Sequence, residues 1–535
     1  MSKKNPKAVQ QPIKNSEKVP YVPFGYAIEG NTLYRIDGDD KIPVCDPLYI
    51  EAAARDDKGD NWGRLLVWHD QDGQRHEWAM PSAMLAADGA EYRRILLSQG
   101  LCIRAGRKAQ NALHDYILSA APKDRALSVA NPGWHKERYV MPDGTVCGDA
   151  DEKVLLQVNG TLPKLEVSGS LEDWQSNVGA LAVGNSRLVF MLSTALVGTL
   201  LYAGNEGPGG FHFPGGSSTG KTTGLRAAAS VWGLSLRSWR TTDNAAESWA
   251  RFAHDGFLPI DEIGQVDGRA ADQMAYMLGN GQTKGRASRD GIARETAEFR
   301  LMFLSTGEIG LAEKLGEQKK KAKAGQTVRM IEIPADAGAG HGMFENLHSF
   351  ASADEFAKNL SRMSQEYKGR VAPEFINRLT EMGFEKLQHV ISGLTDKWLS
   401  DNAPDDADGQ VMRAARRFAL VAVTGELASS FGIFPWPDDE ANNAAARCFK
   451  DWLKQRGGSD SFEVLDGLQN ILQFIQRYGN SRFVNIEVPE EKVIDRAGFR
   501  RKGIGGEWEY MFSLTPSKAK FLAVVKMTAP LSMQQ

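Results

Sequence analysis

The chain has 535 residues, of which 42% are hydrophobic and 24% are charged, and its net charge is -3. This composition is ordinary for a soluble globular protein of two to four domains. Without a global basic excess, any nucleic-acid surface must be a local patch. The four cysteines form no C-x-x-C pair, which argues against a zinc ribbon and a disulfide framework. With no signal-peptide pattern at the start, a cytoplasmic location is expected.

The N-terminal part is predicted to be a tail followed by a β-rich domain. Residues 1–20 contain five lysines and three prolines, which is typical of a disordered tail. Residues 21–165 mostly show strand and turn patterns, with helical stretches near 81–99 and 106–120. Two β-hairpins are expected, one pairing 64–70 with 75–80 and one pairing 138–141 with 145–147.

An uncharged segment of sixteen residues, Leu188–Ala203, has the composition of a membrane span but not its length. A spanning helix needs about 20 residues, and this segment also contains hydroxyl side chains. It is therefore predicted to be a buried helix beside a sheet, and no membrane partner is expected.

The next stretch matches the phosphate-binding pattern G-x-x-x-x-G-K-[ST], between a short apolar strand and a helix. Its glycines let backbone N–H groups surround phosphate oxygens, and the helix N-terminus favours an anion. Lys221 is expected to reach the β- and γ-phosphates of ATP, and the Thr222 hydroxyl to ligate Mg²⁺. The predicted ATP-binding residues are Gly215, Gly216, Ser217, Ser218, Thr219, Gly220, Lys221, Thr222 and Thr223.

An apolar run ending in Asp261-Glu262 follows forty residues after Lys221. Asp261 is predicted to hold Mg²⁺ and Glu262 to polarise the attacking water. The spacing lets two parallel strands present both sites at one sheet edge. Pro259 removes a sheet hydrogen bond, so an irregular strand is expected there.

Three further positions complete the predicted catalytic set. The apolar strand 299–306 ends in two hydroxyls, of which Thr306 is preferred for orienting the lytic water and Ser305 is the alternative. Arg329, just before the apolar strand 330–333, can act in trans on a neighbour's γ-phosphate. Arg413, near the start of an amphipathic helix, can reach back to the nucleotide. For both arginines a surface charge is the alternative.

The alternation of helices and strands after about residue 171 indicates an α/β fold. The expected domains are an ATPase core at 166–335, a helical lid at 336–435 and a small α+β domain at 436–535. In the last, two helices precede strand-like pieces, an order compatible with a winged helix.

The order of these motifs resembles the AAA+ ATPases, and within them the hexameric helicases, including MCM-like and superfamily-three helicases. In those proteins a β-hairpin between the second and third motifs projects basic residues into a central channel that holds DNA. The resemblance implies a hairpin with its tip at 288–291 and DNA-binding side chains at Lys284, Arg286, Arg289 and Arg294. A solvated hairpin with ordinary charges is the alternative.

More closely, the chain resembles an ATPase family known as a domain of unknown function, which occurs in replication modules of phages, plasmids and integrative elements. The segments that carry this resemblance, beside the phosphate loop and Asp261-Glu262, are 131–135, 284–287, 416–420 and 425–428. Two positions depart from the helicase patterns. Ser305-Thr306 stands where helicase relatives usually have Asn, and Arg329 lacks the Ser-Arg-Phe-Asp context of MCM proteins.

The resemblance implies an ATP-dependent DNA helicase or translocase that replicates a mobile genetic element. The expected assembly is a hexameric ring acting on single-stranded or forked DNA, with a primase or polymerase encoded nearby as a partner. Two alternatives stay open. One is an AAA+ ATPase for protein remodelling or host defence without unwinding, and the other is an ATP-controlled DNA-binding initiator. The basic hairpin favours DNA in the channel.

Overall fold

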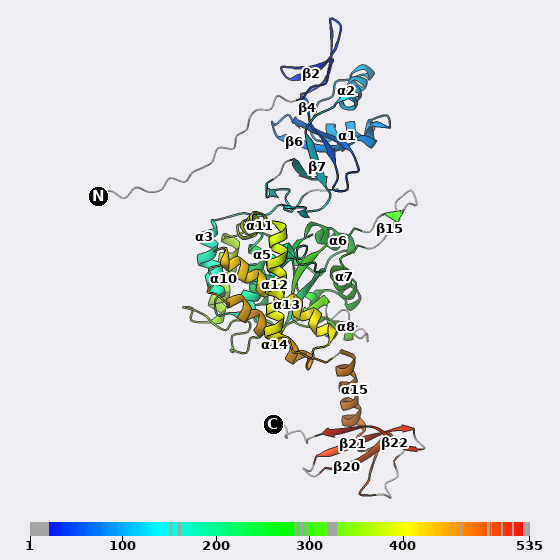
Figure 1. The fold of residues 1–535 in the computed structure, drawn as a ribbon, viewed down its shortest axis with the longest axis vertical. Helices are drawn as coiled ribbons and strands as arrows, with labels where there is room; N and C mark the ends of the chain where they lie inside the picture. The colour runs from blue at the N-terminus through cyan, green and yellow to red at the C-terminus, as the bar shows by residue number, and fades with distance from the viewer. Residues whose placement is uncertain are drawn as a thin grey trace, which may run out of the picture.

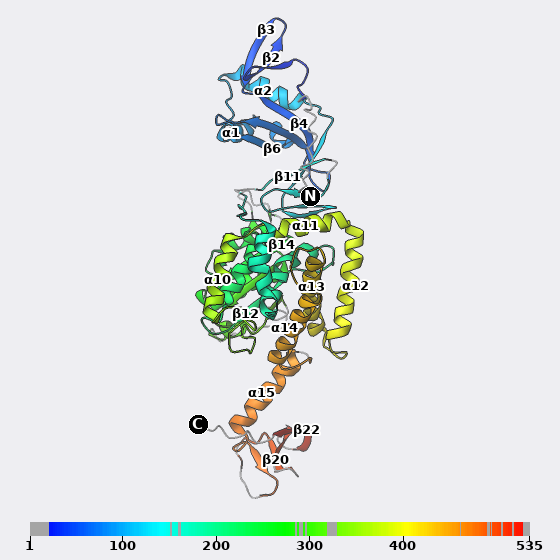
Figure 2. The same cartoon turned by 90° about the vertical axis from the view of Figure 1, so that its left-hand side faces the viewer.

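The computed structural model describes residues 21–149, 152–158, 162–283, 286–287, 293–294, 297–317, 329–460, 462–488, 493, 495–503, 507–515 and 518–527. Figures 1 and 2 show three units along the long axis of the molecule. A β-rich N-terminal unit and a large central α/β unit are followed by a small C-terminal unit at the end of helix α15. The protein is thus a mixed α/β molecule with a β-rich N-terminal region.

The N-terminal unit is built on a five-stranded sheet of order β11-β7-β4-β5-β6. Its β5–β6 hairpin pairs Gly63 with Pro81 through His69 with Arg75, which confirms the first predicted hairpin. One face packs on α2 through Leu66, Trp68 and the α2 residue Tyr116. The elements are β4 (Leu48–Arg55), β5 (Gly63–His69), β6 (Arg75–Pro81), α1 (Ala90–Ser98), α2 (Arg107–Ser119), β7 (Arg125–Val129) and β11 (Lys153–Leu156), with a β1-β2-β3 sheet of Tyr26–Glu29, Thr32–Asp37 and Asp40–Cys45.

A small sheet joins this unit to the central one. It consists of β8 (Gly133–His135), β9 (Arg138–Val140) and β10 (Val146–Cys147), and the β9–β10 pairing confirms the second predicted hairpin. The Trp134 Nε1 donates to the Thr199 carbonyl oxygen at 2.7 Å. The Tyr139 hydroxyl donates to the carbonyl oxygen of Asp255, also at 2.7 Å. These bonds fix the N-terminal unit to the amino end of the central sheet.

The central sheet has five parallel strands in the order β13-β14-β17-β12-β18. Because β17 lies between β14 and β12, three chain segments end side by side at the carboxyl edge. The chain leaves β12 toward β13 and leaves β17 toward β18, so the crossovers diverge around β12, where such sheets form their binding crevice. The strands are β12 (Gly209–Pro214), β13 (Arg237–Ser238), β14 (Gly256–Asp261), β17 (Leu301–Gly307) and β18 (Met330–Glu332).

Helices cover both faces of this sheet, and alternate residues of each strand contact opposite layers. In β17, Met302 and Leu304 pack in the main core with α4 and α5. Leu301 and Phe303 pack in a second core with α6, α7 and α8. The covering helices are α4 (Ser186–Val197), α5 (Lys221–Ser230), α6 (Asp243–Phe252), α7 (Gly268–Asn280) and α8 (Leu311–Gly316).

Strand β14 is regular, contrary to the expectation from Pro259. Its register with β17 runs without a shift from Gly256 to Ile260. Strand β13 pairs with β14 only at Ile260 and Asp261, so Pro259 lies outside the stretch that is paired on both sides. The missing N–H is therefore tolerated.

Helix α4 contains the first ten residues of the uncharged segment, preceded by Ser186 and Arg187, and all its residues after Ser186 are buried. This confirms the prediction of a buried helix. Within the described ranges, no helix combines the length and apolarity that a membrane crossing requires.

The helices that follow the sheet pack on α4 and α5. The α14 residues Cys448, Phe449 and Trp452 share one core with Phe418 of α13. The expected boundary at 436 thus falls before a helix of the central unit, because the apolar face of α14 is buried there. The elements are α10 (Ala353–Glu366), α11 (Val371–Met382), α12 (Phe384–Asn402), α13 (Gly409–Ser430) and α14 (Glu440–Arg456), after α3 (Leu171–Trp174).

The C-terminal unit combines one described helix with a four-stranded sheet of order β19-β20-β21-β22. Phe483 and Tyr510 of the sheet pack with Ile475 of the helix. The winged-helix interpretation stays a prediction. The elements are α15 (Phe462–Tyr478), β19 (Phe483–Asn485), β20 (Gly498–Lys502), β21 (Trp508–Thr515) and β22 (Lys518–Met527).

Candidate functional site

The glycine-rich loop of residues 215–220 connects the carboxyl end of β12 to the first residue of α5. Gly220 has a φ of 90°, a left-handed conformation that favours glycine. A Cβ at this position would also lie 2.6 Å from the Phe344 ring. Glycine is therefore required here by both conformation and space, and the loop turns sharply into the helix.

Lys221, the first residue of α5, folds its side chain back onto this loop. Its side chain is buried, and the Nζ donates to the carbonyl oxygens of Gly215 at 2.8 Å and Gly216 at 2.5 Å. Burial lowers the pKa of its ammonium, while Glu262 and Glu308 act in the opposite direction. The positive charge is thus held at the point where the loop N–H groups and the α5 N-terminus favour an anion.

Asp261, at the end of β14, joins the three neighbouring segments. Its Oδ1 accepts a hydrogen bond from the Thr222 hydroxyl at 3.3 Å and one from the Thr306 hydroxyl at the end of β17. Three side chains from three parts of the sequence therefore meet at one edge of the sheet. A carboxylate beside two hydroxyls is an oxygen donor set of the kind that Mg²⁺ binds.

The two hydroxyls at the end of β17 point to opposite faces. Ser305 bonds with His212 Nδ1 at 2.9 Å and accepts from Trp239 Nε1 at 2.8 Å, both inside the sheet. Thr306 lies on the face covered by α5, next to Asp261. The geometry therefore places Thr306, rather than Ser305, in the candidate site.

Glu262 directly follows Asp261 and has a φ of 62°, which is uncommon for a side chain other than glycine. Its Oε1 accepts from the Gly264 N–H at 3.1 Å. Such a conformation carries a steric penalty that persists where the surrounding structure enforces it, often at functional sites. Glu308, whose charge raises the pKa of Lys221, was not identified from the sequence. The available signal was an acidic residue directly after β17, the strand that ends near Ser305 and Thr306.

Arg329 lies at the opposite edge of the sheet from Lys221. It immediately precedes β18, whose Met330 pairs with Gly210 near the start of β12. Its guanidinium lies 5.7 Å from the centre of the Tyr276 ring, which is half exposed. The loop that carries Lys221 begins at the other end of β12, five residue steps or about 16 Å away.

Arg413 lies near the same edge as Arg329. It and Arg329 both act on the pKa of Arg417, which burial lowers to about 10. Arg417 donates to the Pro208 carbonyl oxygen at 2.7 Å, at the start of β12. The expectation that Arg413 reaches back to the nucleotide stays a prediction. The spacing of residues in the sequence could not show where Arg413 lies, because the path of α13 across the sheet is set by packing.

The predicted DNA hairpin is described only in part. Strands β15 (Arg286–Ala287) and β16 (Ala293–Arg294) pair in antiparallel register, with Arg286 opposite Arg294. Figure 1 shows β15 extending from the central unit beyond α6 and α7. Lys284 and Arg289 lie outside the described residues, as do the side chains of Arg286 and Arg294.

The fold and site thus define an α/β protein with a phosphate-loop-like crevice at the carboxyl edge of a parallel sheet. A family model described as Domain of unknown function (DUF927) matches residues 28–298, just over half of the chain. This protein belongs to that family. No curated protein matches the chain.

Among solved structures, the chain is similar to one described as "SCCmec type IV Cch - active helicase". The two are 16% identical with a TM-score of 0.64, over 92% of this chain and 88% of that chain. The likeness shows a shared fold across nearly the whole molecule. Two structures of NtrX from Brucella abortus, one with ATP, are 13% and 14% identical over 50% and 58% of this chain, and 64% and 70% of theirs. Their TM-scores of 0.19 and 0.18 carry no structural argument.

Proposed function

We propose that this protein is an ATP-dependent DNA helicase or translocase of the AAA+ class. The observation that carries the proposal is that Asp261 and Thr306, at the ends of two adjacent parallel strands, meet Thr222 of α5 beside the buried Lys221. This arrangement offers phosphate binding, metal binding and water positioning within one crevice. The fold shared with a structure described as an active helicase supports the same reading.

In this proposal each residue has a separate role in phosphoryl transfer. Lys221 and the loop N–H groups hold the β- and γ-phosphates of ATP, and Glu262 with Thr306 orients the attacking water. Thr222 and Asp261 would hold Mg²⁺, which, when bound, neutralises charge on the β- and γ-oxygens. The remaining loop residues, Gly215 to Gly220, and Thr223 in the first turn of α5 complete the nucleotide contacts.

The substrate proposed is single-stranded or forked DNA, bound in the channel of a hexameric ring by the hairpin of Lys284, Arg286, Arg289 and Arg294. The edge that carries Arg329 and Arg413 lies away from the chain's own phosphate loop, which suits action on a neighbouring copy. The setting proposed is replication of a mobile genetic element in the cytoplasm, with a nearby primase or polymerase as partner. In this arrangement the N-terminal unit at 21–165 serves as a collar or binds DNA, and the C-terminal unit that begins with α15 binds DNA or partners.

The test is ATP hydrolysis with and without single-stranded DNA, together with unwinding of a fluorescent fork. We expect DNA to stimulate hydrolysis and the fork to be unwound. Lys221→Ala should abolish both, because the phosphate charge is lost. Its circular dichroism should match the wild type, since Lys221 is buried but belongs to neither of the hydrophobic cores that flank the sheet.

Each alternative has its own outcome. If the rate of ATP hydrolysis is the same with and without DNA and the fork is not unwound, protein remodelling would be favoured. DNA binding that depends on ATP without unwinding would favour an initiator. Full hydrolysis by Lys221→Ala would remove the site assignment itself.

A further inference from the structure

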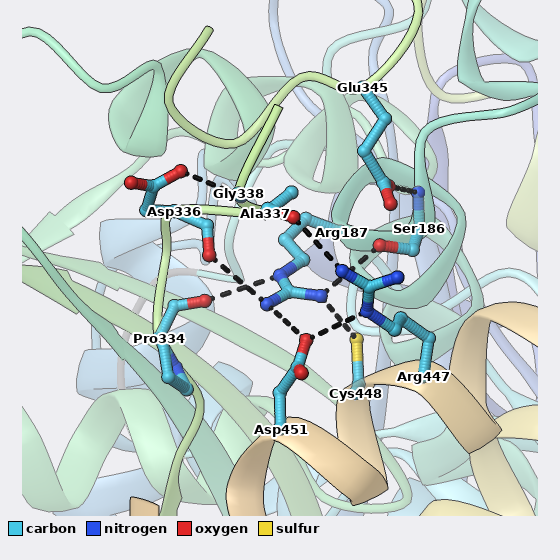
Figure 3. Close-up of polar contacts among 10 residues, drawn as sticks. All are labelled: Ser186, Arg187, Pro334, Asp336, Ala337, Gly338, Glu345, Arg447, Cys448 and Asp451. Carbon is cyan, nitrogen blue, oxygen red and sulfur yellow. Dashed lines mark hydrogen bonds and ion pairs between the residues drawn. The ribbon is translucent and has the colours of Figure 1, made fainter. Parts of the chain in front are cut away.

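A buried arginine lies behind the phosphate loop and belongs to no motif found in the sequence. Arg187, near the start of α4, is 1% exposed. Its Nε donates to the Pro334 carbonyl oxygen and an Nη to the Asp336 carbonyl oxygen, each at 3.2 Å. Figure 3 shows the guanidinium between these carbonyls and α14. A fully buried cation of this kind requires a partner charge.

That charge comes from α14. Asp451 accepts from Arg187 at 2.8 Å and from Arg447 Nε at 3.1 Å, so one carboxylate joins two arginines. Arg447 in turn donates to the Ala337 carbonyl oxygen at 3.1 Å. Burial raises the pKa of the adjacent Cys448 thiol to about 12, so the thiol is neutral and does not share this role. Glu345 is occupied by the backbone N–H of Ser186 at 2.5 Å.

The backbone held by these side chains is the wall of the phosphate loop. The Ala335 N–H donates to the Pro214 carbonyl oxygen and the Met343 N–H to that of Thr219, both at 3.0 Å. The segment 335–343 therefore contacts the loop at its beginning and its end. A Cβ at Gly342 would lie 2.6 Å from the Thr219 oxygen, which shows how closely the two backbones approach.

We propose that Arg187, Arg447 and Asp451 are positioning residues that fix the phosphate loop through the wall segment 335–343. The unit makes α14, the helix that leads to the C-terminal unit, part of the nucleotide site. A change in the position of α14 then shifts the loop. A movement of the C-terminal unit can therefore change the affinity for the nucleotide. The functional half of this inference rests on the proposed ATP binding, whereas the structural half does not.

The test uses Asp451→Asn in the full-length protein, because asparagine keeps the shape and removes the charge. The matched control is Glu152→Gln, which breaks a pair with Arg55 in the N-terminal unit whose carboxylate is about as exposed as that of Asp451. Hydrogen–deuterium exchange should be about tenfold faster at the Ala335 and Met343 amides in Asp451→Asn only. Affinity for a fluorescent ATP analogue should fall about tenfold with kcat within about twofold, since misplacing a binding group weakens the ground-state complex.

A second variant, Arg447→Gln, should show a smaller shift of the same kind, because Arg187 keeps its carboxylate. The proposal is overturned if exchange at 335–343 in Asp451→Asn equals that in Glu152→Gln. It is also overturned if exchange rises but affinity for the analogue stays at the wild-type value. If the wild-type protein binds no nucleotide, the proposed function is wrong. The exchange experiment then still shows whether Arg187, Arg447 and Asp451 fix the segment 335–343.

Discussion

At the residue scale, Glu262 is the side chain whose backbone conformation is the most informative. Its φ of 62° turns the chain immediately after the β14 carboxylate and aims the next segment away from the sheet. The strain is consistent with a residue placed for chemistry.

We expect Glu262→Gln to bind ATP with near wild-type affinity and to hydrolyse it about 10²–10⁴-fold more slowly, the range for loss of a general base. Analogue binding and single-turnover hydrolysis measure the two effects separately. Loss of binding in this variant would contradict the assigned role, since the carboxylate would then be needed to form the site.

His212 predicts a pH dependence of stability. It is fully buried between Ser305 and the Ile309 carbonyl oxygen, and burial lowers its pKa to about 4. The folded state therefore binds a proton less readily than the unfolded state, in which the histidine pKa is about 6.5. The contribution of His212 to the free energy of unfolding is therefore fully present above pH 6.5. It decreases by up to about 3 kcal/mol as the pH falls from 6.5 toward 4.

Denaturant unfolding at pH 7, 6, 5 and 4.5 measures this loss. His212→Gln keeps two polar atoms and cannot titrate, so its stability should decline less steeply over the same range. Identical slopes for the two proteins would assign the acid sensitivity to other groups.

At the element scale, strand alternation and helix placement together decide the site. Thr306 lies on the α5 face of β17 and Ser305 on the opposite face. Asp261 lies on the same face as Thr306, and Thr222 lies in the first turn of α5. The crevice is therefore the place where one face of the sheet meets the N-terminus of one helix.

The hairpin of β15 and β16 is the element proposed to contact DNA. Arg286→Ala combined with Arg294→Ala should weaken DNA binding and unwinding but leave hydrolysis without DNA unchanged. Each lost phosphate contact should reduce the log–log salt slope by about 0.7 on single strands, or about 1.4 for the pair.

Fluorescence anisotropy with labelled single-stranded DNA at several salt concentrations measures this slope. The control is Lys358→Ala with Arg362→Ala, which removes two exposed cations from α10. If both double variants show the wild-type slope, the hairpin is a solvated surface element and the DNA site must be sought elsewhere.

At the scale of the whole molecule, the separation between Arg329 and Lys221 leads to a prediction about assembly. A guanidinium at the far edge of the sheet can serve a γ-phosphate only in a neighbouring copy. Arg329→Ala and Lys221→Ala should each be inactive, by about 10³-fold or more for the arginine. Mixed, they should regain some hydrolysis, because some interfaces pair an intact Lys221 with an intact Arg329.

The mixture must be prepared where subunits exchange, which fluorescence transfer between labelled copies reports. Activity that never exceeds the sum of the separate variants, with exchange demonstrated, would leave the trans role without support. Full activity of Arg329→Ala alone would make this residue a surface charge held by Tyr276. Arg300, which directly precedes β17, is not available for the same role, because both carboxylate oxygens of the buried Asp255 accept hydrogen bonds from its guanidinium.

The sequence by itself determined the features that depend on neighbouring residues. The glycine loop, the apolar run before Asp261, the two N-terminal hairpins and the buried α4 follow from local conformation and periodicity, which a few consecutive residues encode. The approximate extent of the β-rich region follows for the same reason.

Only the tertiary structure decided which side chains meet. The choice between Thr306 and Ser305 depends on which face α5 covers, and the place of Arg413 depends on where α13 crosses β12. The assignment of α14 to the central core and the link from Asp451 through Arg187 to the glycine-rich loop join residues more than a hundred positions apart. Such contacts arise from packing among whole elements, and no local pattern in the chain specifies them.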